Sequence, residues 1–452
     1  MSLADARRCI SASVPRTPEA HLIESDFGRH LFVADGSRLF DTEPGLFARW
    51  KAAADGDGAA MEALLRLADV GDSPYIDDAP PHAPPVRALS LAIAQKCNLG
   101  CSYCYAQQGD FGGAAKNMSR SDALSAVDLL VAGAESGARL NLAFLGGEPL
   151  VNRPILQAAA RHARALADAR GANITFSVTT NGTVLTEDDA SFFEDFGFAV
   201  TVSVDGPRET HDALRPFKGG AGSFDALMRR VKPLLHRQRK MQVSARVTVT
   251  PVNLALRRTL DELIEAGFHS VGFSPMLSSP TGEREMQRDH LELMLGEMID
   301  CGREYERRSM LGQRYPFANM VNAMREIHRG THRPYPCGAG AGYLGVSADG
   351  ELAACHRFVG DEDGAMGTLA AGVNLARQAK WLEERHVHRQ EPCRSCWARY
   401  LCGGGCHHEV LRRGRPACDY IRGWLHFCLE AYLRLVPRPG DAGSSASVAS
   451  YG

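Results

Sequence analysis

The chain has 452 residues, 44% of them hydrophobic and 23% charged, which is enough for two or three domains with sizeable cores. Its 51 basic and 53 acidic residues nearly balance, which argues against a nucleic-acid partner or an anionic membrane surface. No apolar run approaches the ~20 residues of a membrane span, and the N-terminus lacks the long apolar segment of a secretory signal, so a cytoplasmic location is expected.

The first 78 residues predict a small unit at the N-terminus. The segments HLFV and RLFD flank ADGS at 34–37, which is a hairpin pattern, and two short helical patterns follow. We expect this unit to span residues 1–78. A proline-rich stretch at 79–86 predicts a stiff linker to the rest of the chain.

Strand-like and helical patterns alternate between residues 87 and 276. Strands are expected at 87–94, 140–145, 173–180, 198–204, 242–250 and 270–275, and helices at about 119–137, 153–170, 187–195, 223–239 and 255–266. Such alternation predicts an α/β fold with a parallel sheet, either curled as a partial (β/α)6 TIM-like barrel or left open. In both cases the C-terminal ends of the strands should carry the chemistry.

Beyond this core, helical patterns near 285–309 and 317–329 predict a bridge over 277–330. The bridge leads to a cysteine-rich domain at 331–436. The remaining tail, 437–452, has a composition typical of disorder.

The 13 cysteines are unevenly placed, and in a cytosolic chain they favour metal sites over disulfides. Cys97, Cys101 and Cys104 follow the first expected strand of the core with spacings of four and three residues. Three thiolates so spaced can hold three corners of an iron–sulfur cube and leave the fourth iron open to a small molecule. A zinc knuckle or a set of buried thiols is the alternative interpretation.

Polar turns follow the next expected strands, at the edge where a parallel barrel binds its ligands. After the second strand, Gly146 and Gly147 allow close approach of the backbone to a ligand, and Glu148 offers a carboxylate to an ammonium group. TTNGT at 179–183 follows the third strand. After the fourth, Ser203 and Asp205 offer a hydroxyl and a carboxylate suited to a ribose or a carboxylate group.

Two arginines accompany these turns. Arg215 belongs to the pattern HDxxRP after the fourth strand, and Arg246 lies in the fifth strand-like segment among apolar residues. A buried cation needs a partner, and a cofactor carboxylate or a carboxylate of the core would serve equally well.

A second group of cysteines lies in the C-terminal domain, where glycines allow the tight turns that wrap a cluster. Its members are Cys337, Cys355, Cys393, Cys396, Cys402, Cys406, Cys418 and Cys428. Two tetra-thiolate clusters need eight ligands, so this group suffices for two. A zinc site is the alternative that a CxxC pair alone would allow.

The order of the motifs is more specific than any one of them. CxxxCxxC, GGE, TNG and SxDG after successive strands closely resemble the core of radical S-adenosylmethionine (SAM) enzymes, over about residues 87–276. The resemblance implies a [4Fe–4S] cluster on the first three cysteines, with a SAM molecule on its open iron. The implied SAM contacts are Gly146, Gly147 and Glu148 for the amino group, Tyr103 along the adenine, and Ser203 for the ribose or carboxylate; Asp205, Arg215 and Arg246 are further candidates. In such enzymes, one-electron reduction cleaves SAM to methionine and a 5′-deoxyadenosyl radical, which abstracts hydrogen from the substrate.

The second group of cysteines resembles the SPASM extension of these enzymes, which carries two auxiliary iron–sulfur clusters. The resemblance implies one cluster on Cys337, Cys355 and Cys406. The other would use Cys393, Cys396 and Cys402, completed by Cys418 or Cys428, and one of that pair could instead complete the first cluster. Where the family often has another cysteine shortly after the first, this chain offers only Tyr343, so an open iron or an unusual ligand is expected there.

SPASM enzymes mostly modify peptides or proteins. The resemblance therefore implies an oxidoreductase that forms a thioether or carbon–carbon crosslink within a ribosomally made precursor peptide or small protein. The N-terminal unit and the segment CGGGCHHEV resemble maturases of this kind, including those that crosslink the small subunit of quinohemoprotein amine dehydrogenase. The resemblance makes the unit 1–78 a candidate peptide-binding element; packing against the barrel is its alternative role. A flavodoxin- or ferredoxin-like protein would be the reductant.

Anaerobic sulfatase maturases, which oxidise cysteine or serine to formylglycine, are the main alternative. They carry an aspartate as proton acceptor directly after the cysteine equivalent to Cys355, where this chain has His356. A histidine can also move protons near neutral pH, which makes His356 a candidate catalytic residue. An alternative of another class is a non-catalytic iron–sulfur electron carrier or a zinc-stabilised binding protein.

Overall fold

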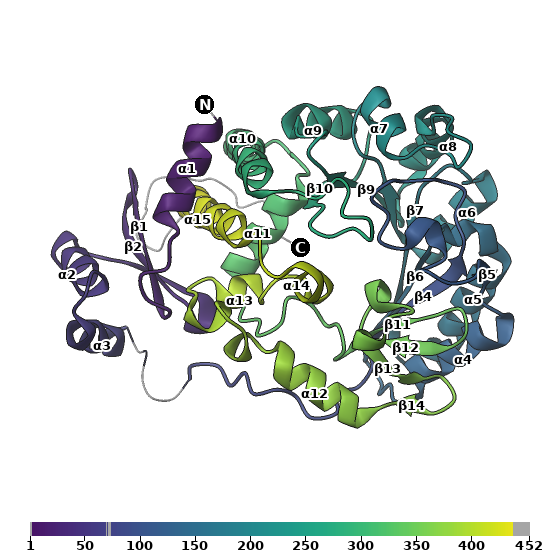
Figure 1. The fold of residues 1–452 in the computed structure, drawn as a ribbon, viewed down its shortest axis with the longest axis horizontal. Helices are drawn as coiled ribbons and strands as arrows, with labels where there is room; N and C mark the ends of the chain where they lie inside the picture. Colours follow the sequence, from purple (N-terminus) through teal and green to yellow (C-terminus); the bar gives the residue numbers. More distant parts are fainter. Residues whose placement is uncertain (1, 69, 71–73, 437–452) are drawn as a thin grey trace.

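The computed structural model describes residues 2–68, 70 and 74–436 (Figure 1). The tail expected to be disordered, 437–452, lies outside the described residues. Within the part of the chain that is described, no helix is long and apolar enough to cross a lipid bilayer.

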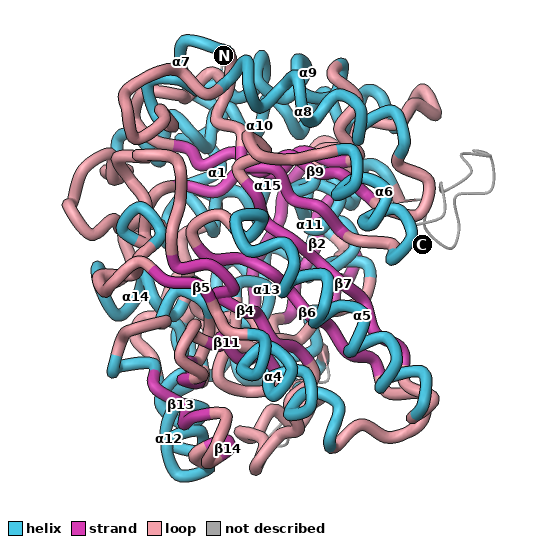
Figure 2. Tube along the Cα trace, turned by 90° about the vertical axis from the view of Figure 1, so that its right-hand side faces the viewer, coloured by secondary structure: helices cyan, strands magenta, loops and turns pink. Residues whose placement is uncertain are grey.

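Six parallel strands form the centre of the molecule, as the alternating patterns predict. They lie side by side in chain order: β4 (Ala88–Gln95), β6 (Arg139–Gly146), β7 (Asn173–Thr180), β8 (Ala199–Ser203), β9 (Gln242–Val249) and β10 (Ser270–Pro275). Figure 2 shows β4, β6 and β7 running together through the body of the protein. The sheet does not close on itself, because β10 ends it on one side and β4 pairs onward with a different strand on the other. The predicted α/β class with an open, partial barrel is therefore confirmed.

Helices connect these strands and cover the sheet. They are α4 (Arg120–Ala132), α5 (Arg153–Ala169), α6 (Glu187–Phe196), α7 (Arg208–Leu214), α8 (Phe224–Arg237) and α9 (Leu256–Glu265). Side-chain caps begin two of them, since Ser119 accepts from the Asp122 amide and Thr186 forms a capping box with Asp189. The short helix α7 and the two-residue strand β5 (Lys116–Asn117), which pairs antiparallel with β4, were not predicted from the sequence.

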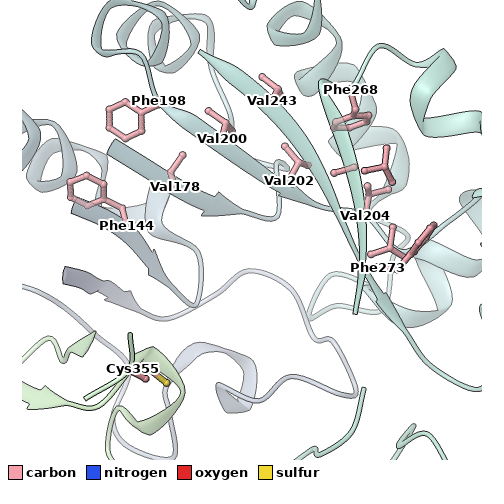
Figure 3. Close-up of a cluster of buried hydrophobic side chains, with 14 of the residues drawn as sticks. Phe144, Val178, Phe198, Val200, Val202, Val204, Val243, Phe268, Phe273 and Cys355 are labelled. Atoms are coloured by element: carbon pink, nitrogen blue, oxygen red, sulfur yellow. The ribbon is translucent and has the colours of Figure 1, made fainter. Parts of the chain in front are cut away.

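The core lies between the sheet and these helices. Along β7 and β9 buried and more exposed residues alternate, so every second side chain faces the same side of the sheet. Figure 3 shows Phe144, Val178, Val200 and Val243 from four neighbouring strands, and all of them are at most 1% exposed.

The cysteine-rich region continues the same sheet. Strand β11 (Tyr343–Val346) pairs in parallel with β4, and an antiparallel extension follows through β12 (Glu351–Ala353), β13 (Ala365–Thr368) and β14 (Gly372–Val373). The helices of this region are α12 (Leu375–Arg385), α13 (Arg399–Cys402), α14 (His407–Arg413) and α15 (Cys418–Leu435). A shared sheet fixes the cysteine-rich region against the strand that precedes Cys97.

The N-terminal segment divides between two bodies. Strands β1 (Ala20–Ser25), β2 (Gly28–Val33) and β3 (Arg38–Asp41) form a small antiparallel sheet, and α2 (Pro44–Ala54) and α3 (Gly58–Leu67) pack with it around a separate cluster of apolar residues. The hairpin and the two helices match the sequence prediction.

Helix α1 (Ser2–Ala12), in contrast, was not predicted and belongs to the main core. It packs against α10 (Arg288–Met310) and α15, near the bridging helix α11 (Ala318–His328), as Figure 1 shows. Ala6 and Cys9 are fully buried there, and Arg8 makes two 2.8 Å hydrogen bonds to Glu430. Residues 2–12 are thus part of the scaffold of the large body.

The position of α1 leads to a stability test. Ala6→Glu would place an unpaired carboxylate in the core, which costs about 3 kcal/mol or more, so we expect a clearly lower thermal unfolding midpoint. Ala4→Glu on the exposed side of the same helix is the matched control and should leave the midpoint nearly unchanged. Equal midpoints for the two variants would contradict the packing of α1.

Candidate functional site

The first three candidate metal ligands lie on one loop after β4. Cys101 is 8% exposed, and Cys97 and Cys104 are half-buried. Burial raises the pKa of each thiol, whereas the guanidinium of Arg215 lowers all three. The Leu99 amide donates to Cys97 Sγ at 3.4 Å. The loop therefore gathers three thiols around one buried cation that favours their thiolate forms.

Within the described residues, no group of three or more His, Cys, Asp or Glu side chains has the geometry to hold a single metal ion. Thiolates at the corners of a four-iron cube lie farther apart than the ligands of one ion. Soft sulfur donors on a loop that leaves one corner free suit an iron–sulfur cluster with an open position, and in this sense the residues present fit the group.

Gly146 and Gly147 bring the turn after β6 against this loop. The Gly147 amide donates to Ala94 O at 2.8 Å, and the Glu148 amide donates to Lys96 O at 2.9 Å. A Cβ on either glycine would collide with one of these two carbonyl oxygens. Glycine is needed here for backbone contact between the two segments, a reason that the sequence pattern alone does not reveal.

Glu148 is fully buried and links two turns. Its Oε1 accepts from Thr180 Oγ1 at 2.8 Å and from the Leu150 amide at 3.1 Å, and its Oε2 accepts from the Asn181 amide at 2.7 Å. Burial raises the pKa of this carboxyl to about 6 in spite of these donors. A carboxylate has about four acceptor positions, so capacity for one further donor, such as an ammonium group, remains.

Tyr103, Asp205 and Arg215 form a buried triad beside the cysteine loop. Tyr103 donates its hydroxyl to Asp205 Oδ2, and Arg215 Nη1 donates to the Tyr103 hydroxyl at 2.6 Å. Arg215 also lies 3.6 Å from Asp205 Oδ2, and the other carboxylate oxygen accepts from the Thr248 amide at 2.9 Å. Three residues that the sequence suggests as separate cofactor contacts are in fact bonded to one another.

Ser203 and Arg246 lie on adjacent strands at the same end of the sheet. Ser203 is the last residue of β8, and it pairs in register with Arg246 of β9. Arg246 donates a hydrogen bond to Ser274 Oγ of β10. The surrounding protein lowers the pKa of its guanidinium, although part of the side chain remains in contact with solvent. The carboxylate that acts on it electrostatically is Glu409 of the cysteine-rich region. Arg246 therefore faces the junction of the two regions.

The cysteines of the C-terminal region form two groups, defined by which thiols interact electrostatically with one another. Burial raises the pKa of Cys355 to about 12, and the neighbouring Cys406 and Cys337 raise it as well; Cys406 also raises the pKa of Cys337. Cys393, Cys396, Cys402 and Cys418 form the second group, in which burial raises the pKa of Cys393 to about 12 and of Cys402 to about 11. Three thiols lie in one group and four in the other.

Cys428 belongs to neither group. It is fully buried in α15, 4.0 Å from Met320 Sδ, and the groups that act on it are Glu306 and Cys9. Its surroundings are those of a small apolar core residue.

His356 lies between the two cysteine-containing regions. Its Nδ1 is 2.7 Å from the hydroxyl of Tyr343, which in turn is 2.8 Å from Ser90 Oγ on β4. Burial lowers the pKa of His356 to about 4. Its ring also packs edge-on against Tyr105, the residue after Cys104.

Arg357 makes a second link that sequence reasoning missed. It lies over the Tyr105 ring, donates to Glu409 at 2.7 Å and approaches Cys406 Sγ at 3.9 Å. The sequence feature that could have identified this residue is an arginine next to a cysteine-histidine pair. Tyr105, His356 and Arg357 thus form a half-buried connection between the CxxxCxxC loop and the group of three cysteines.

Comparison with known proteins places this arrangement in a family. Residues 91–253 match the family model described as the radical SAM superfamily. A serine-type anaerobic sulfatase-maturating enzyme of Klebsiella aerogenes is 27% identical over 356 residues, which cover 76% of this chain and 86% of that protein. A cysteine-type enzyme of Clostridium novyi is 30% identical over 210 residues, 44% of this chain and 54% of that protein.

Two solved structures share the fold. anSMEcpe with bound AdoMet gives a TM-score of 0.63 at 21% identity and covers 78% of this chain and 94% of its own. SuiB of Streptococcus suis, solved with its precursor peptide SuiA, gives 0.52 at 13% identity and covers 88% of this chain and 97% of its own. The cofactors expected from the sequence, SAM and iron–sulfur clusters, are those of such enzymes. Residues 91–253 therefore form a radical SAM domain, and the chain is similar in sequence to anaerobic sulfatase-maturating enzymes and in fold to anSMEcpe and SuiB.

Proposed function

We propose that this enzyme is a peptide maturase that forms an intramolecular thioether or carbon–carbon crosslink in a ribosomally made peptide or small protein. When SAM and a reduced cluster are bound, they supply a 5′-deoxyadenosyl radical that can abstract a substrate hydrogen. The single observation that carries the proposal is the junction of the CxxxCxxC loop with a second set of cysteines through Tyr105, His356 and Arg357.

In this proposal Cys97, Cys101 and Cys104 hold the first cluster and Arg215 balances their negative charge. Glu148 would use its remaining acceptor position for the SAM amino group. Ser203, at the end of β8, and Arg246, its neighbour in register within β9, suit the SAM carboxylate or ribose.

Tyr103, Asp205 and Arg215 hold the loop in place through their mutual hydrogen bonds, so the chain's own residues fix the geometry of the site.

The two cysteine groups of the C-terminal region would hold the auxiliary clusters. The group of four, Cys393, Cys396, Cys402 and Cys418, has a full ligand set, which favours Cys418 over Cys428. The group of three would leave one iron without a thiolate. A flavodoxin- or ferredoxin-like protein would supply electrons to the first cluster.

The N-terminal unit favours a peptide substrate. Residues 79–436 make up about 79% of the chain, so a fold match over 88% of it extends into residues 1–78. That match is SuiB with a bound precursor peptide, whereas the match to anSMEcpe covers 78% of the chain. The small sheet β1–β3 with α2 and α3 is therefore the part of this chain we assign to peptide recognition.

Oxidation of a cysteine or serine to formylglycine is the second candidate function. The names of two relatives favour it, since both are sulfatase-maturating enzymes. Here His356 would take the place of the aspartate that accepts a proton in those enzymes. With Nδ1–H donating to the Tyr343 hydroxyl oxygen, Nε2 of the neutral ring would be free to accept a substrate proton.

A product assay separates the two functions. Incubation of the reconstituted enzyme without oxygen, with SAM, a reductant and the peptide encoded beside its gene, should yield 5′-deoxyadenosine and a peptide two hydrogens lighter with an internal crosslink in its fragmentation spectrum. A sulfatase-derived peptide in a parallel reaction should stay unchanged. Formylglycine in that peptide, with no change in any neighbouring candidate, would support the second function instead.

Iron analysis tests the assignment of the auxiliary ligands. Cys418→Ala removes the fourth thiolate of its group, so we expect iron content to fall by up to about four atoms per chain. Cys428→Ala is the matched control and should retain the iron of the unaltered enzyme, with a small loss of thermal stability from the cavity. Iron loss in Cys428→Ala but not in Cys418→Ala would reverse the assignment.

A further inference from the structure

Asn181, the first residue after β7, contacts the sulfur of Cys97. Its side-chain Nδ2 lies 3.6 Å from Cys97 Sγ and 2.9 Å from Asn98 Oδ1. The residue is 5% exposed, so water does not compete for these contacts. It belongs to the TTNGT turn, to which the proposed function assigns no role.

The direction of this amide is fixed by its neighbours. Asn181 Oδ1 accepts from the Thr183 amide at 2.9 Å and from the Thr183 hydroxyl at 2.7 Å. An amide nitrogen could not accept these two hydrogen bonds, so the oxygen must face Thr183. The two hydrogens on Nδ2 therefore point toward Asn98 and Cys97, and Asn98 Nδ2 closes the ring by donating to Thr183 Oγ1 at 2.8 Å.

The backbone of the same residue holds the other side of the site. The Asn181 amide donates to Glu148 Oε2 at 2.7 Å. The charge of Glu148 also acts on Cys97. Burial raises the pKa of the Cys97 thiol, and the charge of Glu148 raises it further. Asn181 thus lies between a buried carboxylate and the half-buried Cys97 sulfur, and donates one hydrogen bond to each.

We propose that Asn181 is a positioning residue that raises the reduction potential of the cluster held by Cys97. Hydrogen bonds to cluster sulfurs stabilise the reduced state, which carries one more negative charge. The Leu99 amide makes a second such contact with Cys97 at 3.4 Å. This inference rests on the proposed function, in which Cys97 is a ligand of the SAM-binding cluster.

Asn181→Asp tests the proposal with little change in shape. One carboxylate oxygen can keep both donors from Thr183, while the other replaces the donor near Cys97 with a negative charge. At a fixed potential, we expect the ratio of reduced to oxidised cluster to fall at least about tenfold, a shift of about 59 mV for a one-electron couple. The measurement is a redox titration of the reconstituted enzyme, followed by the electron paramagnetic resonance signal that changes when SAM is added.

Two further variants separate electronic from structural effects. Asn173→Asp introduces the same charge at the exposed opposite end of β7, about 25 Å away, and should leave the potential unchanged. Thr183→Val removes one of the two donors that orient the Asn181 amide and should shift the potential in the same direction by a smaller amount. If Asn181→Asp takes up no iron at the first site, the shift of the reduction potential in Thr183→Val tests the proposal instead.

A potential in Asn181→Asp or in Thr183→Val equal to that of the Asn173→Asp control would overturn the proposal. If the unaltered enzyme shows no signal that responds to SAM, the proposed function itself fails, and this result is distinguishable from an unchanged potential in a responsive enzyme.

Discussion

The turn after β6 lies so close to the end of β4 that no side chain fits between them. Gly147 and Glu148 donate backbone hydrogen bonds to Ala94 and Lys96, immediately before Cys97. Because either glycine's Cβ would meet a carbonyl oxygen, this contact exists only with glycine at both positions. It sets where the cysteine loop begins and where Glu148 lies, and through Glu148 it sets the position of the next turn at Thr180 and Asn181.

The pairing of β4 with β11 extends this fixed arrangement of turns and strands into the C-terminal region. One strand is joined on one side to β6, which bears the glycine turn, and on the other to β11, which leads to Cys355. The Ser90–Tyr343–His356 chain of hydrogen bonds crosses this strand pair. A change in the register of β11 would therefore move the second set of cysteines relative to the first, so the sheet itself sets the spacing between the metal-binding regions.

Periodicity and turn residues were sufficient to predict the six parallel strands and most of their helices, because buried parallel strands have apolar runs bounded by glycines and polar turns. Helix α1 was missed because its apolar residues pair with α10 and α15, more than 270 residues away, a contact with no local signal. The continuation of the sheet into β11 was missed for the same reason, since only four residues carry it. Tyr103, Asp205 and Arg215 were singled out as separate candidates, yet their bonding to one another depends on the loop after β4 meeting the segment after β8.

Charge explains why this set of residues suits a cationic ligand. Asp205 and Glu148 are buried beside three cysteines, and the cation that acts on all three thiols is Arg215. Once the thiols deprotonate, the buried negative charges outnumber this guanidinium, and a low-polarity interior makes such an imbalance costly. Iron ions and a ligand bearing ammonium and sulfonium groups supply positive charge where it is lacking. The site would then be most stable with both present, because their positive charge would offset the cost of burying thiolates that raises the pKa of each thiol.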